Sequence, residues 1–183
     1  MKVLLLGSCG YIGSVLHPML VQAGHEVTGY DINPPDRTDL KIIKGDIRHR
    51  ELIEAALEGK DAVIHLAMMS NNDWITANPL EADSINTEPF PHCIKAAKRL
   101  GVKRFIYASS VAAYGSSTEQ LTEEHTLKPE TVYGQHKAFC EAWVQACESD
   151  SFSCLRVRAG TVWGQSPRMR WDTTVNRMRK DSW

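Results

Sequence analysis

A tyrosine and a lysine stand four residues apart in the segment Tyr133-Gly134-Gln135-His136-Lys137. The helix predicted for this segment would carry both side chains on one face. A free tyrosine has a pKa of about 10 and is a poor base at pH 7, but a neighbouring ammonium and a helix N-terminus, here with Thr131 as N-cap, favour the phenolate. We therefore predict that these groups, together with a positively charged ligand bound beside the phenol, lower the pKa of Tyr133 and let it work as a base. By itself such a pair is more often a coincidence, so the rest of the chain must decide.

Two serines and a glycine-rich turn supply the remaining parts of such a site. Ser109 and Ser110 follow a predicted strand, where a hydroxyl would reach the crevice at the carboxyl ends of the strands. Near the N-terminus, glycines recur at spacings of three and three after a buried strand. The first permits a tight turn, the second lets a pyrophosphate approach the backbone, and the third lets a helix pack closely. The helix that opens here would offer its first amides to phosphates. The predicted ligands of this turn are Gly7, Gly10, Tyr11, Ile12 and Gly13.

An aspartate ends the next predicted strand. Asp31 stands 18 residues after Gly13, where a carboxylate can accept hydrogen bonds from the adenosine ribose. Since a carboxylate repels a 2′-phosphate, the sequence favours NAD over NADP, although the nearby Arg37 keeps NADP as a second choice. The alternative for Asp31 is an ordinary turn residue at the end of a strand.

Two more strand ends complete the predicted cofactor site. Asp46 and Ile47 end the third strand within reach of an adenine, and Asp46 could equally be a helix-capping residue. Leu66, Ala67 and Met68 end the fourth strand, where small or apolar groups would flank the nicotinamide half of the cofactor.

The elements that must position these residues alternate along the chain. Short apolar runs separated by helix-like periodicities predict an α/β fold, a Rossmann-type doubly wound parallel sheet of about six strands. The strands are expected at residues 2–6, 26–30, 40–44, 62–66, 104–108 and 152–157. Besides the helix after the glycine turn, helices are expected at 50–57, at 80–100 with interruptions at Pro89 and Pro91, and at 132–148, while 69–78 reads as a polar loop.

Composition sets the broad class of the protein. The 183 residues are 43% hydrophobic and carry a formal net charge of −1, which argues against nucleic acid and anionic membranes as partners. Neither a signal peptide nor a membrane span is expected, and five cysteines without Cys-x-x-Cys spacing read as reduced thiols, so the predicted location is the cytoplasm. No metal site is predicted. The segment from Arg156 to the end holds seven basic and two acidic residues, a solvated surface or a patch that attracts phosphates.

Taken together, the motifs resemble the extended short-chain dehydrogenase/reductase family, specifically its NAD-dependent epimerase/dehydratase branch acting on nucleotide sugars. The matching stretches are GSCGYIG at 7–13, GYD at 29–31, GDI at 45–47, HLA at 65–67, RFIYASSVAAYG at 104–115, YGQHK at 133–137 and RAGTVWG at 158–164.

The resemblance implies a role for several residues. It makes Tyr133 the general base, makes Lys137 its partner and a ligand of the cofactor ribose, and has Ser110 orient the substrate hydroxyl. Both Tyr133 and Ser109 would also contact the cofactor. Asn86 would hold the cofactor near the active site, although without the resemblance it reads as a polar helix residue.

The sequence also departs from the family pattern. We expect a dinucleotide-binding domain at 1–164 and a polar, basic tail at 165–183, with the last strand and the C-terminal substrate lobe missing. Thr161 replaces an asparagine that contacts substrate in many members. Pro89 and Pro91 fall in a helix used for dimerisation, which puts an implied homodimer in question. Two main hypotheses follow: an oxidoreductase or epimerase acting on a nucleotide sugar, or a non-catalytic NAD-binding module or truncated regulatory form. A poorly stable fragment is a third.

Overall fold

A single parallel sheet organises the chain. The computed structural model describes residues 1–36 and 39–164, so Arg37 and the predicted basic tail lie outside the described residues. The strands follow the spatial order β3-β2-β1-β4-β5-β6, and every neighbouring pair is parallel. The predicted six-stranded, doubly wound α/β fold is therefore confirmed. Their bounds are β1 Lys2–Leu6, β2 Glu26–Asp31, β3 Ile42–Lys44, β4 Ala62–His65, β5 Arg104–Ser110 and β6 Ser153–Ala159.

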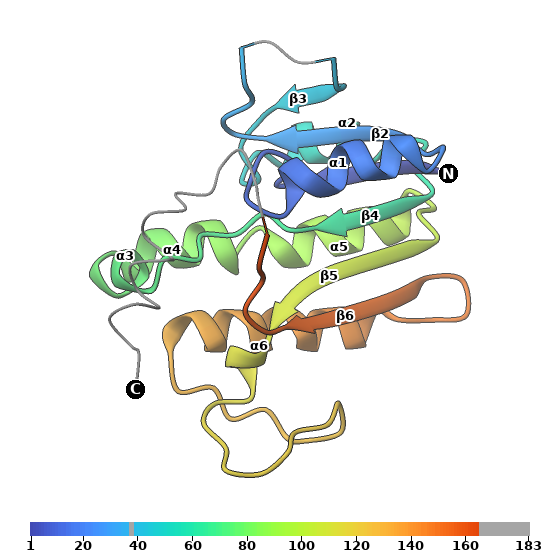
Figure 1. Ribbon diagram of the computed structural model, residues 1–183. Coiled ribbons are helices and arrows are strands. Elements are labelled where there is room, and N and C mark those ends of the chain that lie inside the picture. The colour runs from blue at the N-terminus through green and yellow to red at the C-terminus, as the bar shows by residue number, and fades with distance from the viewer. Residues whose placement is uncertain (37–38, 165–183) are drawn as a thin grey trace.

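Helices lie on both faces of this sheet, as Figure 1 shows. The helices α2, α5 and α6 cover one face, where α5 contacts both α2 and α6, and α1 packs against β1 and β2 on the other face. The helices α3 and α4 lie beyond the carboxyl ends of the strands. Helix bounds are α1 Gly13–Gln22, α2 Arg50–Leu57, α3 Asn72–Ala77, α4 Pro79–Asn86, α5 Phe90–Arg99 and α6 Val132–Cys147, with a 3-10 turn, η1, at Val111–Ala113.

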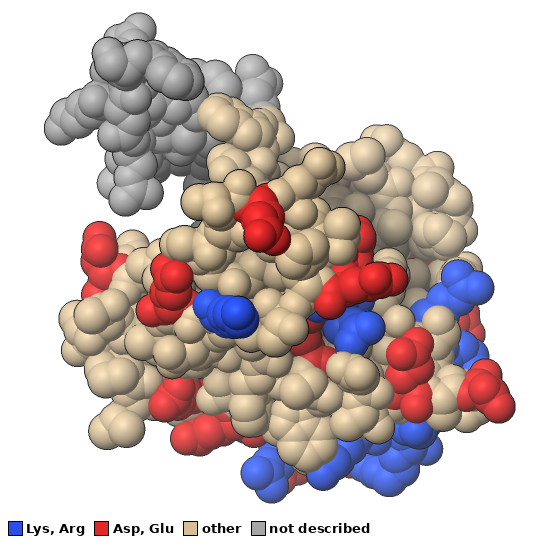
Figure 2. Space-filling model, turned by 90° about the horizontal axis from the view of Figure 1, so that it is seen from below, with Lys and Arg blue, Asp and Glu red and all other residues tan. Residues whose placement is uncertain are grey.

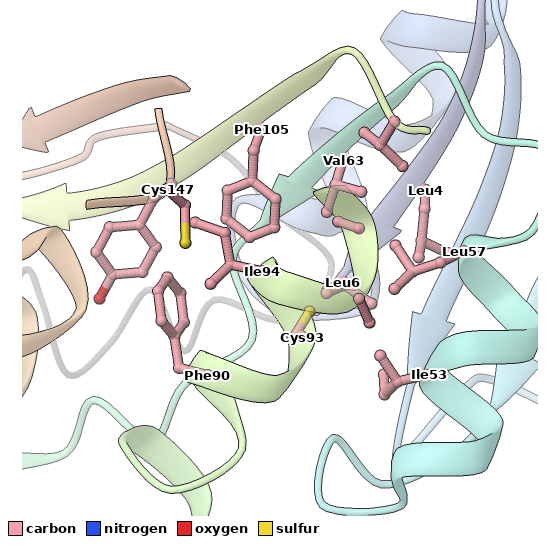
Figure 3. Packing of buried hydrophobic residues seen from close by; sticks show 14 of the residues in the cluster. Leu4, Leu6, Ile53, Leu57, Val63, Phe90, Cys93, Ile94, Phe105 and Cys147 are labelled. Carbon is pink, nitrogen blue, oxygen red and sulfur yellow. The ribbon is translucent and has the colours of Figure 1, made fainter. Parts of the chain in front are cut away.

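The two faces of β1 explain its unbroken apolar sequence. Side chains alternate along a strand, so Leu4 and Leu6 face the three-helix side while Val3 and Leu5 face α1. On the three-helix side, β1 shares the larger core with α2 and α5, as Figure 3 shows around Phe90 and its neighbours. A strand buried on both faces is apolar at every position. The core thus fixes β1, and with it the glycine turn that follows.

The interruption expected within the helical segment 80–100 is a complete break between two helices. The chain forms α4 and α5, with Pro89 at the N-cap of α5 and Pro91 in its first turn. An amide in the first turn of a helix has no intrahelical acceptor, so a proline there removes no helical hydrogen bond. The loop expected at 69–78 contains α3, which Asn71 caps by accepting a hydrogen bond from the amide of Trp74 at 2.9 Å.

The described surface carries charges of both signs. Figure 2 shows acidic and basic side chains distributed among neutral ones over one face of the molecule. None of the described helices is long and apolar enough to cross a membrane. The described residues also contain no group of three His, Cys, Asp or Glu side chains that could hold a metal ion. None of the five cysteines forms a disulfide bond, and four of them are buried.

Candidate dinucleotide and acid–base site

A cavity opens at the carboxyl edge of the sheet, beside the point where the chain order reverses between β1 and β4. Its volume is about 370 Å³. Its walls bring together eight of the predicted cofactor ligands, which are Gly7, Gly10, Asp31, Asp46, Ile47, Leu66, Ala67 and Met68. Residues from four separate strand ends therefore meet in one place, as their positions in the sequence predict.

The glycine turn needs glycine for different reasons at its three positions. Gly7 has a φ of 80°, and a Cβ there would lie 2.7 Å from the backbone nitrogen of Ala67. A Cβ on Gly13 would overlap the carbonyl oxygen of Gly7. A Cβ on Gly10 would meet nothing closer than that same oxygen at 3.4 Å, so the fold leaves this position open toward the cavity. Gly7 and Gly13 serve packing, and Gly10 keeps the backbone accessible.

The start of α1 presents positive potential to this turn. Its N-cap residue, Ile12, makes no side-chain capping bond, and the first turn contains no acidic residue. The amides at a helix N-terminus favour an anion. The Tyr11 hydroxyl donates to the carbonyl of Gly164 at 2.8 Å, and Ile12 lines an apolar groove with Trp163. The side chains of the two predicted ligands thus point to the C-terminal end of the described chain, which leaves their backbone amides as the groups that could meet phosphates.

Asp31 joins the glycine turn to the end of β2. Its Oδ2 accepts a hydrogen bond from the Cys9 amide at 2.9 Å, and its Oδ1 accepts one from the Asn33 amide at 3.0 Å. The hydrogen bond with Asn33 is the ordinary turn interaction that was the alternative for Asp31. The hydrogen bond with Cys9 holds the carboxylate against the glycine turn. A carboxylate has further lone pairs for ribose hydroxyls.

Asp46 faces a partner that sequence reasoning missed. Its carboxylate accepts hydrogen bonds from the Arg48 side chain, two of them from Nε at 3.0 Å, and from the Arg48 amide at 2.9 Å. These bonds hold the pKa of Asp46 below its usual range. The N-cap of α2 is His49, so the helix-capping alternative for Asp46 is wrong. Arg48 also lines the cavity, and its place directly after GDI was the only signal in the sequence.

Asn86 lies behind the cavity wall, with its side chain on the backbone of Met69. The Asn86 Oδ1 accepts from the Met69 amide at 2.8 Å, and its Nδ2 donates to the Met69 carbonyl at 3.0 Å. Met69 itself lines the cavity. Asn86 therefore fixes the loop after β4 through two hydrogen bonds. Met69 is a further residue of the cavity wall, and the sequence did not single it out.

Tyr133 and Lys137 lie near the start of α6, next to the end of β5. Thr131 caps this helix, as predicted, by accepting a hydrogen bond from the Gly134 amide at 3.0 Å. The Lys137 Nζ stands 5.4 Å from the centre of the Tyr133 ring and donates to the carbonyl oxygen of Ala108 at 2.5 Å. Ser110 begins η1, where its hydroxyl accepts a hydrogen bond from the Ala112 amide at 3.2 Å.

In the chain without a bound ligand, the pKa of Tyr133 is raised rather than lowered. Burial raises the pKa of Tyr133, and a hydrogen bond with Ser110 opposes that rise only in part. Burial also lowers the pKa of Lys137 to about 8. Any further stabilisation of the phenolate must come from what binds beside it.

Ser109 does not reach the crevice. It is buried, and its hydroxyl donates to Glu141 on α6. Glu141 also pairs with Arg158 of β6, with Nη2 and Oε2 separated by 2.7 Å. Because neighbouring side chains of a strand point to opposite faces, one serine of the pair had to turn toward the core. Ser110 is the one that meets Tyr133.

Comparison with known proteins agrees with this arrangement. The sequence pattern of the NAD dependent epimerase/dehydratase family matches residues 3–181. A 3-beta-hydroxysteroid dehydrogenase of Mycolicibacterium neoaurum is 27% identical over 177 residues, which is 90% of this chain and 48% of the relative. A UDP-glucose 4-epimerase of Lactobacillus helveticus is 30% identical over 171 residues, covering 85% of this chain and 51% of the relative. The chain spans about half the length of these curated relatives.

Solved structures give the same picture. MoeE5 in complex with UDP-glucose and NAD superposes with a TM-score of 0.85 at 26% identity, over 97% of this chain and 60% of MoeE5. A UDP-glucose 4-epimerase superposes with a TM-score of 0.80 at 26% identity, over 91% of this chain and 54% of the other.

Proposed function

The chain belongs to the NAD-dependent epimerase/dehydratase family, and from this membership we propose that it binds NAD along the carboxyl edge of its sheet and acts on a hydroxyl of a nucleotide sugar with Tyr133 as the base. The single observation that carries this proposal is the cavity itself. The cavity brings together the glycine turn, the Asp31 carboxylate and the apolar end of β4. The Asn86 side chain connects Met69, in the cavity wall, to α6, the helix that carries Tyr133.

The residues present fit a dinucleotide. A pyrophosphate needs exposed backbone, which Gly10 and the uncapped start of α1 offer. A ribose needs an acceptor, which Asp31 offers, and the negative charge of that residue favours NAD over a 2′-phosphorylated cofactor. Ile47 and Met68 would add apolar contacts for the two rings. When bound, NAD supplies a hydride acceptor and, in its oxidised form, a positive charge near the phenol.

The acid–base residues then have distinct tasks. Tyr133 removes the proton from the substrate hydroxyl, and the hydrogen bond from Ser110 stabilises the phenolate that does so. Lys137 contributes its ammonium within the same buried site and would hold the ribose. Since burial lowers the pKa of Lys137 to about 8, it carries its positive charge below that pH. We expect turnover to fall above pH 8, as that charge is lost.

Calorimetric titration with NAD tests the cofactor half of the proposal. We expect micromolar affinity, which Asp31→Ala weakens about tenfold or more because a charge-assisted hydrogen bond is lost. The matched control is Asp150→Ala, in an exposed turn before β6, which leaves the affinity unchanged. Equal affinity of the wild type and Asp31→Ala would show that the cofactor site is wrongly assigned.

A turnover screen tests the catalytic half. The chain is incubated with NAD and a panel of UDP-sugars, and NADH or an isomerised sugar is measured. Tyr133→Phe should abolish the product while retaining NAD affinity. A 3-beta-hydroxysteroid belongs in the same panel, since one relative bears that name. NAD binding without turnover on any substrate would favour the alternative, a non-catalytic NAD-binding module.

A further inference from the structure

A buried histidine lies between the two acid–base residues in sequence and has no role in the chemistry above. His136 stands on α6 between Tyr133 and Lys137, with 5% of its side chain exposed. Its Nδ1 lies 3.0 Å from the Asn86 Nδ2, and its Nε2 lies 2.8 Å from Asp83 Oδ1. Asp83 and Asn86 both belong to α4. His136 thus bridges the base-bearing helix and the residue that grips the cavity wall.

The backbone of Met69 fixes the direction of every hydrogen bond in this chain of contacts. An amide N–H can only donate and a carbonyl can only accept, so Met69 requires the Asn86 oxygen to face its N–H and the Asn86 nitrogen to face its carbonyl. The second N–H of Asn86 then points at the His136 Nδ1, which must accept. The ring proton therefore lies on Nε2, which donates a hydrogen bond to the Asp83 carboxylate.

Each member of this chain has its partners as long as His136 supplies an acceptor at Nδ1. A buried donor without an acceptor costs more than the bond itself contributes. Without that acceptor, one N–H of the Asn86 amide is buried without a partner, which weakens the hold of this side chain on Met69 and loosens the loop after β4. The Cys140 thiol also donates to the Asn86 carbonyl at 3.4 Å, so the backbone of Asn86 has a contact with α6 that does not depend on its side chain.

From this geometry we infer that His136 is a positioning residue, which locks Asn86 onto Met69 and so holds the nicotinamide side of the cavity in register with the Tyr133 helix. This inference rests on the proposed function for its link to NAD. The orientation of the loop itself can be measured without any cofactor.

Two isosteric variants separate the two ring nitrogens. In His136→Asn, the side-chain oxygen falls near the Nδ1 position and can still accept from Asn86. In His136→Gln, the polar atoms fall near Nε2 and face Asp83, which leaves Asn86 without its acceptor. The first readout is hydrogen exchange of the Met69 amide in the chain alone. We expect His136→Gln to speed this exchange about tenfold and His136→Asn to stay within about twofold of the wild type.

The second readout is NAD affinity, with urea unfolding of both variants as the measure of overall stability. His136→Gln should weaken NAD binding about tenfold, and His136→Asn should bind NAD about as tightly as the wild type. Equal behaviour of the two variants, in exchange or in affinity, would overturn the inference, because loss of packing alone would not distinguish them. If the wild type binds no NAD, the proposed function fails, and Met69 exchange alone then decides whether His136 positions the loop.

Discussion

At the scale of single residues, α6 is unusual because it carries two charged side chains that are buried. Lys137 is 5% exposed and Glu141 is 2% exposed, and each is satisfied by a specific partner from a neighbouring strand. Lys137 donates to a β5 carbonyl, and Glu141 pairs with an arginine of β6. Buried charges are costly unless they are paired, so these contacts constrain where α6 can sit on the sheet.

Lys137 should make the stability of the fold depend on pH. Its pKa is about 8 in the fold and 10.5 in its ordinary state, so between these values the folded chain releases a proton that the unfolded chain still binds. Stability therefore rises with pH across this window, and below pH 8 the full cost of burying the ammonium is present. We expect the difference in unfolding free energy, wild type minus Lys137→Met, to increase by roughly 2 kcal/mol from pH 7.5 to 9.5.

Urea unfolding at a series of pH values measures this difference. Because the buried cysteines and tyrosines titrate in both proteins, their effects cancel in the comparison. The exposed Lys103→Met is the matched control and should show a flat difference from the wild type. A flat difference for Lys137→Met as well would mean that its ammonium is not desolvated.

Arg158 should be essential to stability through the charge it neutralises. Its guanidinium donates to both carboxylate oxygens of Glu141, and the pairing raises the pKa of Arg158 above its usual range. Arg158→Met would leave Glu141 buried without a counter-charge, at a cost of about 3–5 kcal/mol. Arg156→Met, two residues earlier on the same strand, should cost far less. The double variant Arg158→Met with Glu141→Met should recover part of the loss in urea unfolding, whereas strictly additive losses would contradict a coupled pair.

At the scale of elements, the turn between β1 and α1 combines two needs in three glycines. Gly7 and Gly13 allow the turn to pack against itself and against the end of β4, whereas Gly10 leaves space toward the cavity. Packing and binding are thus assigned to different positions of the same short motif. That separation can be measured.

Alanine substitutions should separate these two roles. Gly13→Ala forces its methyl group into the Gly7 carbonyl and should cost about 2–3 kcal/mol of stability, with NAD affinity lost as well. Gly10→Ala should leave the unfolding free energy within about 0.5 kcal/mol and weaken NAD binding about tenfold or more. Gly160→Ala meets no atom within 4 Å and is the control for both readouts. Wild-type affinity in Gly10→Ala would exclude close approach of a ligand at that turn.

At the scale of the whole molecule, the sheet is covered unevenly. Arg158 meets Glu141 on the α6 side of β6, so by alternation Leu155 and Val157 point to the opposite face. They are 54% and 44% exposed. On that same face α1 packs against β1 and β2, toward the β3 edge of the sheet and away from β6. The described chain therefore presents apolar strand surface to solvent near β6.

This surface should bind hydrophobic dyes in the native state. We expect Leu155→Lys to reduce the fluorescence of a bound anilinonaphthalene dye and to leave the unfolding free energy within about 0.5 kcal/mol, because the side chain is already half exposed. Leu80→Lys is the control, since Leu80 is an apolar residue with 84% exposure on α4. An unchanged signal in Leu155→Lys would place the dye site elsewhere.

Local patterns in the sequence predicted the parallel, doubly wound α/β fold and most of the residues that line the cavity. A continuous apolar strand followed by three spaced glycines is typical of a tight turn from a buried parallel strand into a helix. Residues that end parallel strands meet at one edge of the sheet, whatever their side chains are. For this reason the sequence alone predicts that Gly10, Asp31 and Met68 lie together. The N-cap role of Thr131 depends on its own turn alone, so local sequence predicts it too.

Tertiary structure decided what depends on which partner a side chain reaches. Only the packed α6 shows that Ser109 turns to Glu141, that Lys137 reaches a carbonyl before it reaches Tyr133, and that burial raises the pKa of that tyrosine. The sequence predicts that Pro89 and Pro91 interrupt the helical segment, but only the structure shows that both belong to the start of α5. Hydrogen bonds, desolvation and helix ends form between segments distant in sequence, so their balance is set when those segments meet.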